Sequence, residues 1–421
     1  MNQFRFEGGL KTTLLILIAI GVVSLGITFM GDNAELHYPR FWSNILHNSV
    51  FFTGIAFLAL FFLCACITAW AGWHTVFKRV WEAYSLFLIP GLILMLIIGI
   101  GAGRGWHQMY EWTNTEIVQE DKILQGKSGF LNSGWYVFGT IIIVGLWILV
   151  ATRLRRLSLK EDQVGNVAFT QHHNMRVWAA AGLPLIGFGS AALIWLWVMS
   201  VDPHWYSTLF AWYNGASLFI AMTALTILCL YFLKGRGYYR QVTVEHIHDL
   251  GKYLFAISIF WTYLWFSQYM LIWYGNVGEE TIYFRERIDN YPVWFYGNLV
   301  VNFVLPFLIL MRNDTKRKLG SLAFVALLVF LGHWMDFFLM LKPGIWNAVS
   351  HAAHAGTEGA GHAAEHASSF VAGFTLPGFL EFGTMLGFLG VFLYFFFTVL
   401  SRAPLIPRND PYLAESVHHH V

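Results

Sequence analysis

Residues 46–71 read LHNSVFFTGIAFLALFFLCACITAWA and contain no Asp, Glu, Lys or Arg. The hydrocarbon core of a bilayer is about 30 Å thick, and an α-helix needs about 20 apolar residues to cross it. In that environment a helix satisfies all of its own backbone hydrogen bonds. We therefore predict that this stretch spans a membrane as one helix.

Nine further stretches have the same character. Of the 421 residues, 57% are hydrophobic and 12% are charged, which is half of the roughly 25% charged residues of a soluble domain. The composition predicts an all-α integral membrane protein with ten transmembrane helices. Prolines at positions 90, 184 and 306 are expected to kink the helices that contain them. The first run is not followed by an A-x-A cleavage site, so we expect it to remain in the protein as a membrane helix and not to be removed as a signal peptide. The nine runs are 12–30, 84–102, 134–151, 178–201, 208–232, 250–275, 293–311, 319–341 and 374–400.

Basic residues are distributed unequally between the two ends of these runs. The N-terminus, the C-terminus and the loops after runs 2, 4, 6 and 8, together with Lys252 at the start of run 7, hold 19 of the 26 Lys and Arg residues, and the opposite loops hold 7. Loops rich in Lys and Arg stay on the cytoplasmic side. Both termini of this multi-pass protein are therefore predicted to be cytoplasmic.

A weak internal repeat subdivides the chain. Trp135-Tyr-Val-Phe-Gly139 opens run 4 and Trp294-Phe-Tyr-Gly297 opens run 8, while Asn48 and Asn214 lie near the starts of runs 2 and 6. Runs 2–5 and 6–9 are thus predicted to form two like-oriented four-helix bundles, with runs 1 and 10 peripheral. The expected units are a peripheral helix at 1–40, bundles at 41–207 and 208–342, an outer loop at 343–373, and a peripheral helix with a cytoplasmic tail at 374–421.

Several classes of partner and cofactor are disfavoured. The near balance of 26 basic and 24 acidic residues argues against nucleic acid. Cys64, Cys66 and Cys229 lie inside apolar runs, and no C-x-x-C-H or paired C-x-x-C is present, so we expect no covalent haem and no iron–sulfur cluster. A cytochrome b would need paired histidines on facing helices, whereas only His333 lies well inside a run, with His47 near a helix start.

Run 9 contains the strongest candidate site, Gly332-His-Trp-Met-Asp336. Ionisable residues inside the membrane are costly and are functional candidates by default. His333 and Asp336 are three residues apart and share a helix face, roughly 8 Å below the outer edge. A histidine beside a carboxylate can exchange protons near neutral pH. The alternative is that the two side chains satisfy each other for packing alone.

Other polar residues are predicted at the same outer level, where they could contact a quinone or a proton path. A second polar layer is expected on the cytoplasmic side, where it could serve as a proton entry or could simply be a solvated helix end. The outer set comprises Asp202, His204, Tyr269 and Glu381, with Gln268, Asn298 and Asn302. The cytoplasmic set comprises His248 and Asp249, with His74, Glu82, Arg176, His246 and Lys252.

The loop at 343–372 is rich in Ala, Gly and His. His362 and His366 would share a helix face and could bind a metal, but a flexible polar loop explains the composition equally well. We assign no metal ligands from the sequence.

Three stretches resemble a known family. They are Val198-Met-Ser-Val-Asp-Pro-His-Trp-Tyr-Ser207, the segment from His248 to Met270 with His-Asp-Leu-Gly-Lys-Tyr and Ser-Gln-Tyr-Met, and Gly332-His-Trp-Met-Asp336. They resemble the NrfD-like (polysulfide reductase membrane subunit) family, and within it the second, smaller NrfD-like subunits of bacterial alternative complex III.

This resemblance implies a membrane subunit of a respiratory quinol:cytochrome c oxidoreductase in a bacterial inner membrane. The implied partners are multihaem and monohaem cytochrome c subunits, an iron–sulfur subunit and a second, larger NrfD-like subunit, beside a possible haem–copper oxidase. Haem and iron–sulfur clusters would then reside on partners only, with menaquinone or menaquinol as a possible ligand. Asp202, His333 and Asp336 fall in the matching stretches, with proton handling and quinone contact both open. Two rival functions are a purely structural membrane anchor and an independent secondary transporter.

Overall fold

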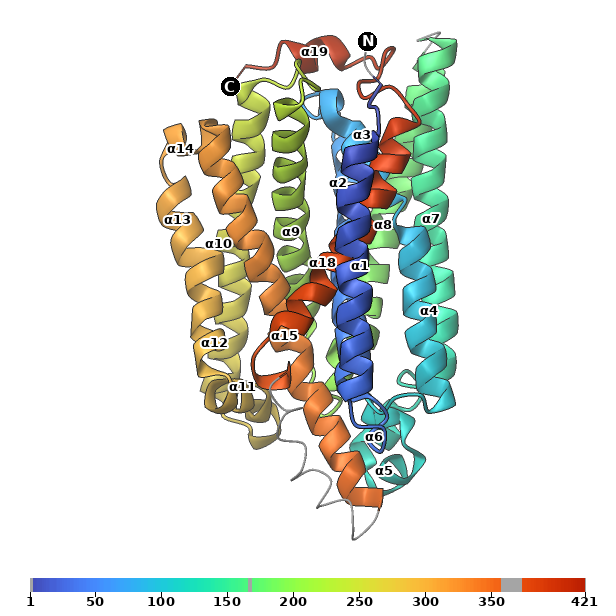
Figure 1. Cartoon of the computed structure of the whole chain (residues 1–421), viewed down its shortest axis with the longest axis vertical. Coiled ribbons are helices and arrows are strands. Elements are labelled where there is room, and N and C mark those ends of the chain that lie inside the picture. The colour runs from blue at the N-terminus through green and yellow to red at the C-terminus, as the bar shows by residue number, and fades with distance from the viewer. Residues whose placement is uncertain (1–2, 166–168, 357–372, 421) are drawn as a thin grey trace.

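The computed structural model describes residues 3–165, 169–356 and 373–420. In these ranges the chain is helical with no β-strand beyond one isolated bridge between Gln3 and Pro404, and ten of its helices are long and apolar enough to cross a membrane. The prediction of an all-α, multi-pass membrane protein is confirmed (Figure 1).

The membrane-spanning helices extend beyond most of the apolar runs because their polar ends continue the helix. The third span is broken between α3 and α4, and the eighth contains a π-helical segment between α12 and α13. The spans are α1 (Gly8–Gly31), α2 (Pro39–Thr68), α3 (Lys78–Ser85) with α4 (Leu88–Arg104), α7 (Ser133–Val164), α8 (Thr170–Trp197), α9 (Thr208–Gly235), α10 (Val244–Gly275), α12 (Pro292–Leu299) with the π segment Val300–Val304 and α13 (Leu305–Leu310), α15 (Leu319–Gly356) and α18 (Phe379–Ser401). Short helices are α5 (Thr115–Glu120), α6 (Lys122–Lys127), α11 (Gly278–Asn290), α14 (Asn313–Arg317) and α19 (Leu413–Val417).

The spans pack as two groups of four. α2, α3–α4, α7 and α8 contact one another in the first group, and α9, α10, α12–α13 and α15 do so in the second. The fourth helix of each group packs on the first helix of the other group: α15 packs on α2, and α8 packs on α9. α2, α9 and α15 lie at this junction and are the most buried spans, whereas α1 and α18 pack mainly on each other.

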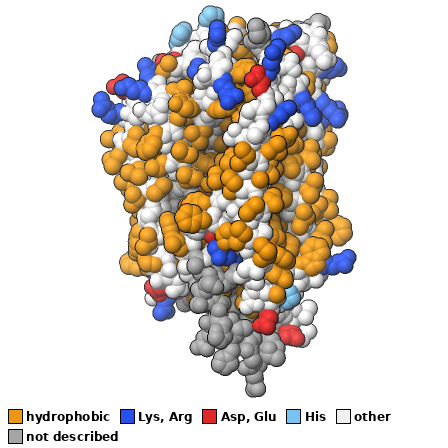
Figure 2. Space-filling view, in the orientation of Figure 1, with side chains coloured by type: hydrophobic (Ala, Val, Ile, Leu, Met, Phe, Trp, Pro, Cys, Tyr) orange, Lys and Arg blue, Asp and Glu red, His pale blue; other side chains and the backbone are white. Residues whose placement is uncertain are grey.

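Both termini lie at the same end of the molecule (Figure 1). We call this end the terminal side, and the end that carries α5, α6 and α11 the loop side. In Figure 2 hydrophobic side chains cover the middle of the visible face, while most Lys and Arg side chains gather at the terminal side. This arrangement agrees with the asymmetry of basic residues in the sequence.

Two expectations need correction. α15 runs on through Pro343 to Gly356, so residues 343–356 are helical rather than loop, because that segment still packs on the loop-side end of the protein. Pro90 does not kink a continuous helix: the helix is already interrupted after Ser85, and Pro90 lies in the first turn of α4, where no backbone donor is needed. His362 and His366, the candidate metal pair, lie outside the described residues.

The contact between α1 and α18 depends on small residues. A Cβ built on Gly21 would lie 2.4 Å from the Cα of Gly387, and one built on Gly383 would lie 2.1 Å from the Oγ of Ser24. Such close backbone approach is a common way for membrane helices to associate, since lipid provides no hydrophobic drive between them.

Replacing Gly21 with leucine should therefore separate α1 from α18. We expect a loss of about 1–3 kcal/mol in stability, because the clash is with backbone that cannot move aside like a side chain. The matched control is Gly26→Leu on the same helix, where a Cβ meets nothing within 4 Å. Thermal unfolding of the two purified variants compares them, and an equal effect of both would contradict the packing described.

Candidate functional site

His333 and Asp336 of α15 lie in the interior of the second bundle. Their side chains are 0% and 1% exposed, and His333 Nδ1 is 3.9 Å from Asp336 Oδ2. The prediction that the two residues share one buried helix face is confirmed.

Four donors from three helices converge on the Asp336 carboxylate. Tyr213 Oη and Asn298 Nδ2 donate to Oδ1, the latter at 2.7 Å. Ser217 Oγ and Trp261 Nε1 each donate to Oδ2 at 3.0 Å. Tyr213 and Ser217 belong to α9, Trp261 to α10 and Asn298 to α12. A buried carboxylate needs such hydrogen bonds, since burying an uncompensated charge is very costly.

Ser217 connects this carboxylate to the imidazole of His333. Its Oγ lies 2.9 Å from His333 Nδ1 as well as 3.0 Å from Asp336 Oδ2. His333 Nε2 is buried and has no hydrogen-bond partner among the described residues. The three side chains therefore form a continuous hydrogen-bonded chain from Asp336 through Ser217 to His333.

The π-helical segment adds Asn302 to this group. Asn302 Nδ2 donates to Asn298 Oδ1 at 2.5 Å. A Cβ on Gly332 would lie 2.1 Å from Asn302 Oδ1, so α15 needs glycine at this position to approach the segment. π-helical insertions are frequent at functional sites. We refer to His333, Asp336, Tyr213, Ser217, Trp261, Asn298 and Asn302 as the Asp336 network.

A small cavity adjoins the network on the loop side. Its volume is about 20 Å³, and its walls include Asp336, Asn298, Gln268 and Arg287. A cavity of about 10–15 Å³ on this measure holds one water molecule. The cavity therefore has room for about one water in contact with Asp336, and none for a quinone ring.

Arg287 of α11, which lines this cavity, is paired with Asp202. Arg287 donates from a terminal nitrogen to Asp202 Oδ2 at 2.9 Å and from Nε to the carbonyl of Leu339 at 2.9 Å. Arg287 is 3% exposed and Asp202 is 14% exposed. Burial raises the pKa of Asp202 above its usual range, although Arg287 opposes the shift.

Two other predicted outer residues occupy different surroundings. His204 Nε2 contacts Asp121, and its Nδ1 is 3.5 Å from Glu111, at the α5–α6 end of the loop side. Tyr269 stacks on Trp265 and contacts Phe284 and Phe295 edge-on or tilted, so it supports aromatic walls of the cavity without contacting Asp336. Neither residue joins the Asp336 network.

Glu381 belongs to a second polar cluster on the opposite face of α15. Arg40 donates to both of its oxygens at 2.7 and 3.0 Å, and Asn44 donates at 3.3 Å. Asn44 in turn accepts from the buried ammonium of Lys342 at 2.7 Å. Glu381 therefore ties α18 to α2 and does not extend the Asp336 network.

On the terminal side, the side chains of the adjacent residues His248 and Asp249 have different neighbours. His248 is buried with no hydrogen-bond partner among the described residues, 3.6 Å from Glu245. Asp249 contacts His419 at 2.6 Å and Lys252 at 2.7 Å. Both residues lie at the start of α10, about three to four helical turns before Trp261, whose ring contacts that of His333.

The two bundles differ in what they place between their third and fourth helices. In the second, Asn298 of α12 meets the carboxylate of Asp336 of α15. In the first, Thr140 of α7 accepts from the indole of Trp197 of α8 at 2.9 Å. Asn48 and Asn214 do correspond, since each donates to the carbonyl four residues earlier at 2.9 Å. Of the two contacts between a third and a fourth helix described above, only the one in the second bundle includes a carboxylate.

Sequence reasoning missed the partners supplied by α9 and α10. Tyr213, Ser217 and Trp261 are ordinary members of apolar membrane helices, and their role depends on which face meets α15. Arg287 was counted only as a loop residue. A buried carboxylate in run 9 implied donors nearby, but it could not identify which helices supply them.

Comparison with known proteins adds no assignment. No family model matches the chain, and no curated protein matches it.

Proposed function

We propose that this chain is a membrane subunit of a respiratory quinol:cytochrome c oxidoreductase, and that its Asp336 network is part of a proton path toward the loop side. In this proposal the termini are cytoplasmic and the loop side faces outward, in a bacterial inner membrane. The 19-to-7 distribution of basic residues supports that orientation. The resemblance to NrfD-like subunits supports the type of complex.

One observation supports the proposed proton path most directly. A buried carboxylate, a hydroxyl and an imidazole lie in continuous hydrogen-bond contact, and the cavity beside the carboxylate holds about one water. Oxidation of a quinol releases protons, and chains of carboxylate, histidine and water are the usual proton relays of membrane proteins. The second bundle thus offers a route from the loop side to His333.

The same observation favours a proton path over a quinone pocket at this position. Pockets for small molecules and cofactors commonly have volumes of about 300–1,000 Å³. The cavity beside Asp336 is about 20 Å³. In the proposal, menaquinol therefore binds elsewhere in the complex, at a site to which the larger NrfD-like subunit contributes. Electrons leave through iron–sulfur and haem c partners, and the isolated chain is inactive.

The two rivals predict different features. A secondary transporter of this design would have interrupted helices at corresponding places in both halves. Here the interruptions fall between α3 and α4, in the second helix of the first bundle, and at Val300–Val304, in the third helix of the second bundle. A purely structural anchor has no need for the hydrogen-bonded chain from Asp336 to His333.

Replacing Ser217 with alanine tests the relay with little change in volume. It removes the hydroxyl between Asp336 and His333, and we expect quinol oxidation by the purified complex to fall about tenfold, equivalent to losing one hydrogen bond of about 1.5 kcal/mol to a charged group. The control is Thr223→Val on the same helix, which removes a buried hydroxyl with no hydrogen-bond partner among the described residues. Equal rates in the two variants would remove Ser217 from the path.

A further inference from the structure

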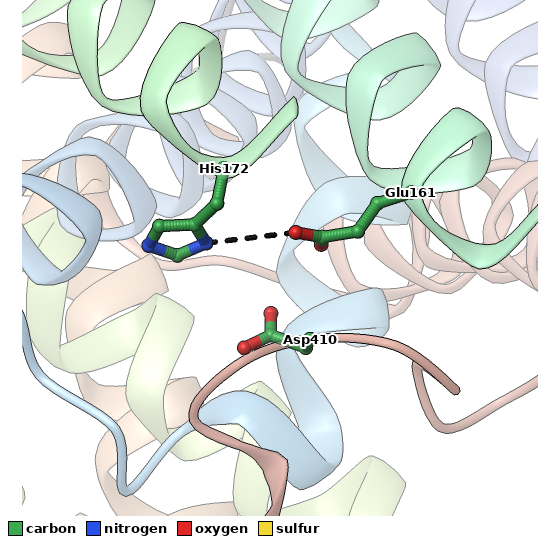
Figure 3. A group of neighbouring side chains, drawn as sticks. All are labelled: Glu161, His172 and Asp410. Carbon is green, nitrogen blue, oxygen red and sulfur yellow. Dashed lines mark ion pairs between the residues drawn. The ribbon is translucent and has the colours of Figure 1, made fainter. Parts of the chain in front are cut away.

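Three potential metal ligands converge on the terminal side from distant parts of the chain. Glu161 lies near the end of α7, His172 lies in the first turn of α8, and Asp410 lies in the segment before α19. Figure 3 shows the three side chains pointing toward one another. One ligand atom from each lies within 4.8 Å of the other two. Their separation in sequence explains why spacing motifs gave no sign of them.

The groups are buried and incompletely satisfied. Glu161 is 1% exposed, and neither of its carboxylate oxygens has a hydrogen-bond partner among the described residues. Both ring nitrogens of His172 are also without hydrogen bonds there, and Nδ1 faces Glu161 Oε1 at 3.8 Å. Buried polar atoms in native proteins nearly always have partners. A cation bound between Glu161 and His172 would satisfy both side chains at once.

The neighbouring side chains include more acidic than basic groups, so a bound cation would not be repelled by a net positive charge. Lys78 contacts the Asp410 carboxylate and lies 3.9 Å from Glu161 Oε2. A neighbouring set of ion pairs joins Arg79 and Arg155 to Glu82 and Asp162, so the two sets together hold three basic and four acidic side chains. The acidic members are Glu82, Glu161, Asp162 and Asp410. Lys78 faces one oxygen of Glu161 and leaves the other directed at His172.

We propose that Glu161, His172 and Asp410 bind a divalent transition-metal ion of the Zn²⁺ type. An imidazole nitrogen with two carboxylate oxygens is a donor set that suits Zn²⁺. Metal–ligand distances of about 2.0–2.2 Å require the three atoms to draw together by roughly 1 Å. Hydrogen bonds to the carboxylates from outside the site are normal in metal centres. Asp410 already has two, from Lys78 Nζ and from the backbone N–H of Tyr412, the latter at 2.9 Å.

A small cavity lies beside the proposed metal site, where a fourth ligand would bind. A cavity of about 10 Å³ is bounded by His172, Asp410 and His74. His74 is 2% exposed, and both of its ring nitrogens lack hydrogen bonds within the described chain. A water in the fourth position would be hydrogen-bonded by His74.

The bound ion would fasten the C-terminal segment to the membrane helices. That segment already reaches α7 through Asn409, whose side chain donates to the carbonyls of Glu161 and Asp162 at 3.3 and 3.0 Å, and through the backbone N–H of Arg408, which donates to Asp162 Oδ1 at 2.8 Å. An ion shared by α7, α8 and Asp410 would add a connection that does not exist in the unfolded chain, and it would stabilise the fold by mass action.

Cobalt binding to the full chain tests the site. The run His418–His420 offers further imidazole ligands for such ions, so all proteins compared carry His418→Gln, His419→Gln and His420→Gln. After dialysis against EDTA, Co²⁺ is titrated into this parent, into its His172→Gln derivative and into its His173→Gln derivative, with His173 being the exposed neighbour. Visible absorption reports tetrahedral Co²⁺, and elemental analysis gives the number of ions bound.

We expect the parent and the His173→Gln protein to bind about one more equivalent of Co²⁺ than the His172→Gln protein, with tetrahedral absorption lost only in the last. Zn²⁺ should displace that equivalent and raise the melting temperature of the parent, but not of the His172→Gln protein. Equal stoichiometry and absorption in all three would overturn the proposal. If His172→Gln lowers the melting temperature in EDTA, Asp410→Asn replaces it and must lose the same equivalent.

Discussion

Replacing Asp336 with asparagine is expected to lower quinol oxidation by the assembled complex roughly 10²-fold, the usual scale for losing a proton-transferring group. Asparagine has nearly the same shape but cannot accept and release a proton. It would also direct an amide N–H₂ toward one of two pairs of donors, Tyr213 with Asn298 or Ser217 with Trp261. The steady-state rate and proton release to the loop side should fall together.

The control for this variant is Asp314→Asn, which alters an exposed carboxylate on the terminal side (76% exposed). A thermal unfolding curve confirms that each variant remains folded. Replacing His333 together with Asp336 distinguishes the proton path from the anchor: unchanged quinol oxidation and unchanged proton release in that double variant would leave only the structural role.

Replacing Arg287 with methionine should destabilise the protein by about 3–5 kcal/mol, the usual cost of breaking a buried ion pair. Asp202 would remain largely buried without its cation, and the carbonyls of Leu339 and Tyr283 would lose a donor at 2.9 Å. Asp202→Asn should also destabilise, because it leaves the guanidinium without its counter-ion. The double variant should lose less than the sum of the two single variants.

The matched control lies on the same helix. Arg285 pairs with Asp289 at 3.4 Å, but the two side chains are 81% and 61% exposed. Surface ion pairs of this kind contribute about 0–1 kcal/mol. Denaturant or thermal unfolding of Arg287→Met and Arg285→Met compares a buried with an exposed pair. A loss no larger for Arg287 than for Arg285 would show that the buried Asp202 pair contributes no more to stability than an exposed pair.

The topology could be predicted from sequence because one physical requirement dominates it. A helix that crosses a bilayer must be apolar over about 20 residues, and stretches such as 46–71 satisfy this without reference to any other part of the chain. Helix ends were harder to predict. The polar continuation of α7 to Val164 and the extension of α15 past Pro343 depend on packing against neighbouring segments.

The candidate site could be predicted only in part, for a related reason. The His333–Asp336 pair followed from helical spacing, and Asn298 followed from its level in the membrane. The contacts of Tyr213, Ser217 and Trp261 depend on how α9 and α10 rotate toward α15, which hydropathy does not specify. The same limit applies to Glu381, whose level was predicted but whose side chain lies with Arg40 on the opposite face of α15.

The most direct test of the central proposal is a high-resolution cryo-EM map of the assembled complex with its quinol bound. The account predicts an ordered water in the cavity between Asp336 and Arg287, with Ser217 still bridging Asp336 to His333, and quinol density elsewhere. A quinone ring within hydrogen-bond distance of Asp336 or His333 would contradict it.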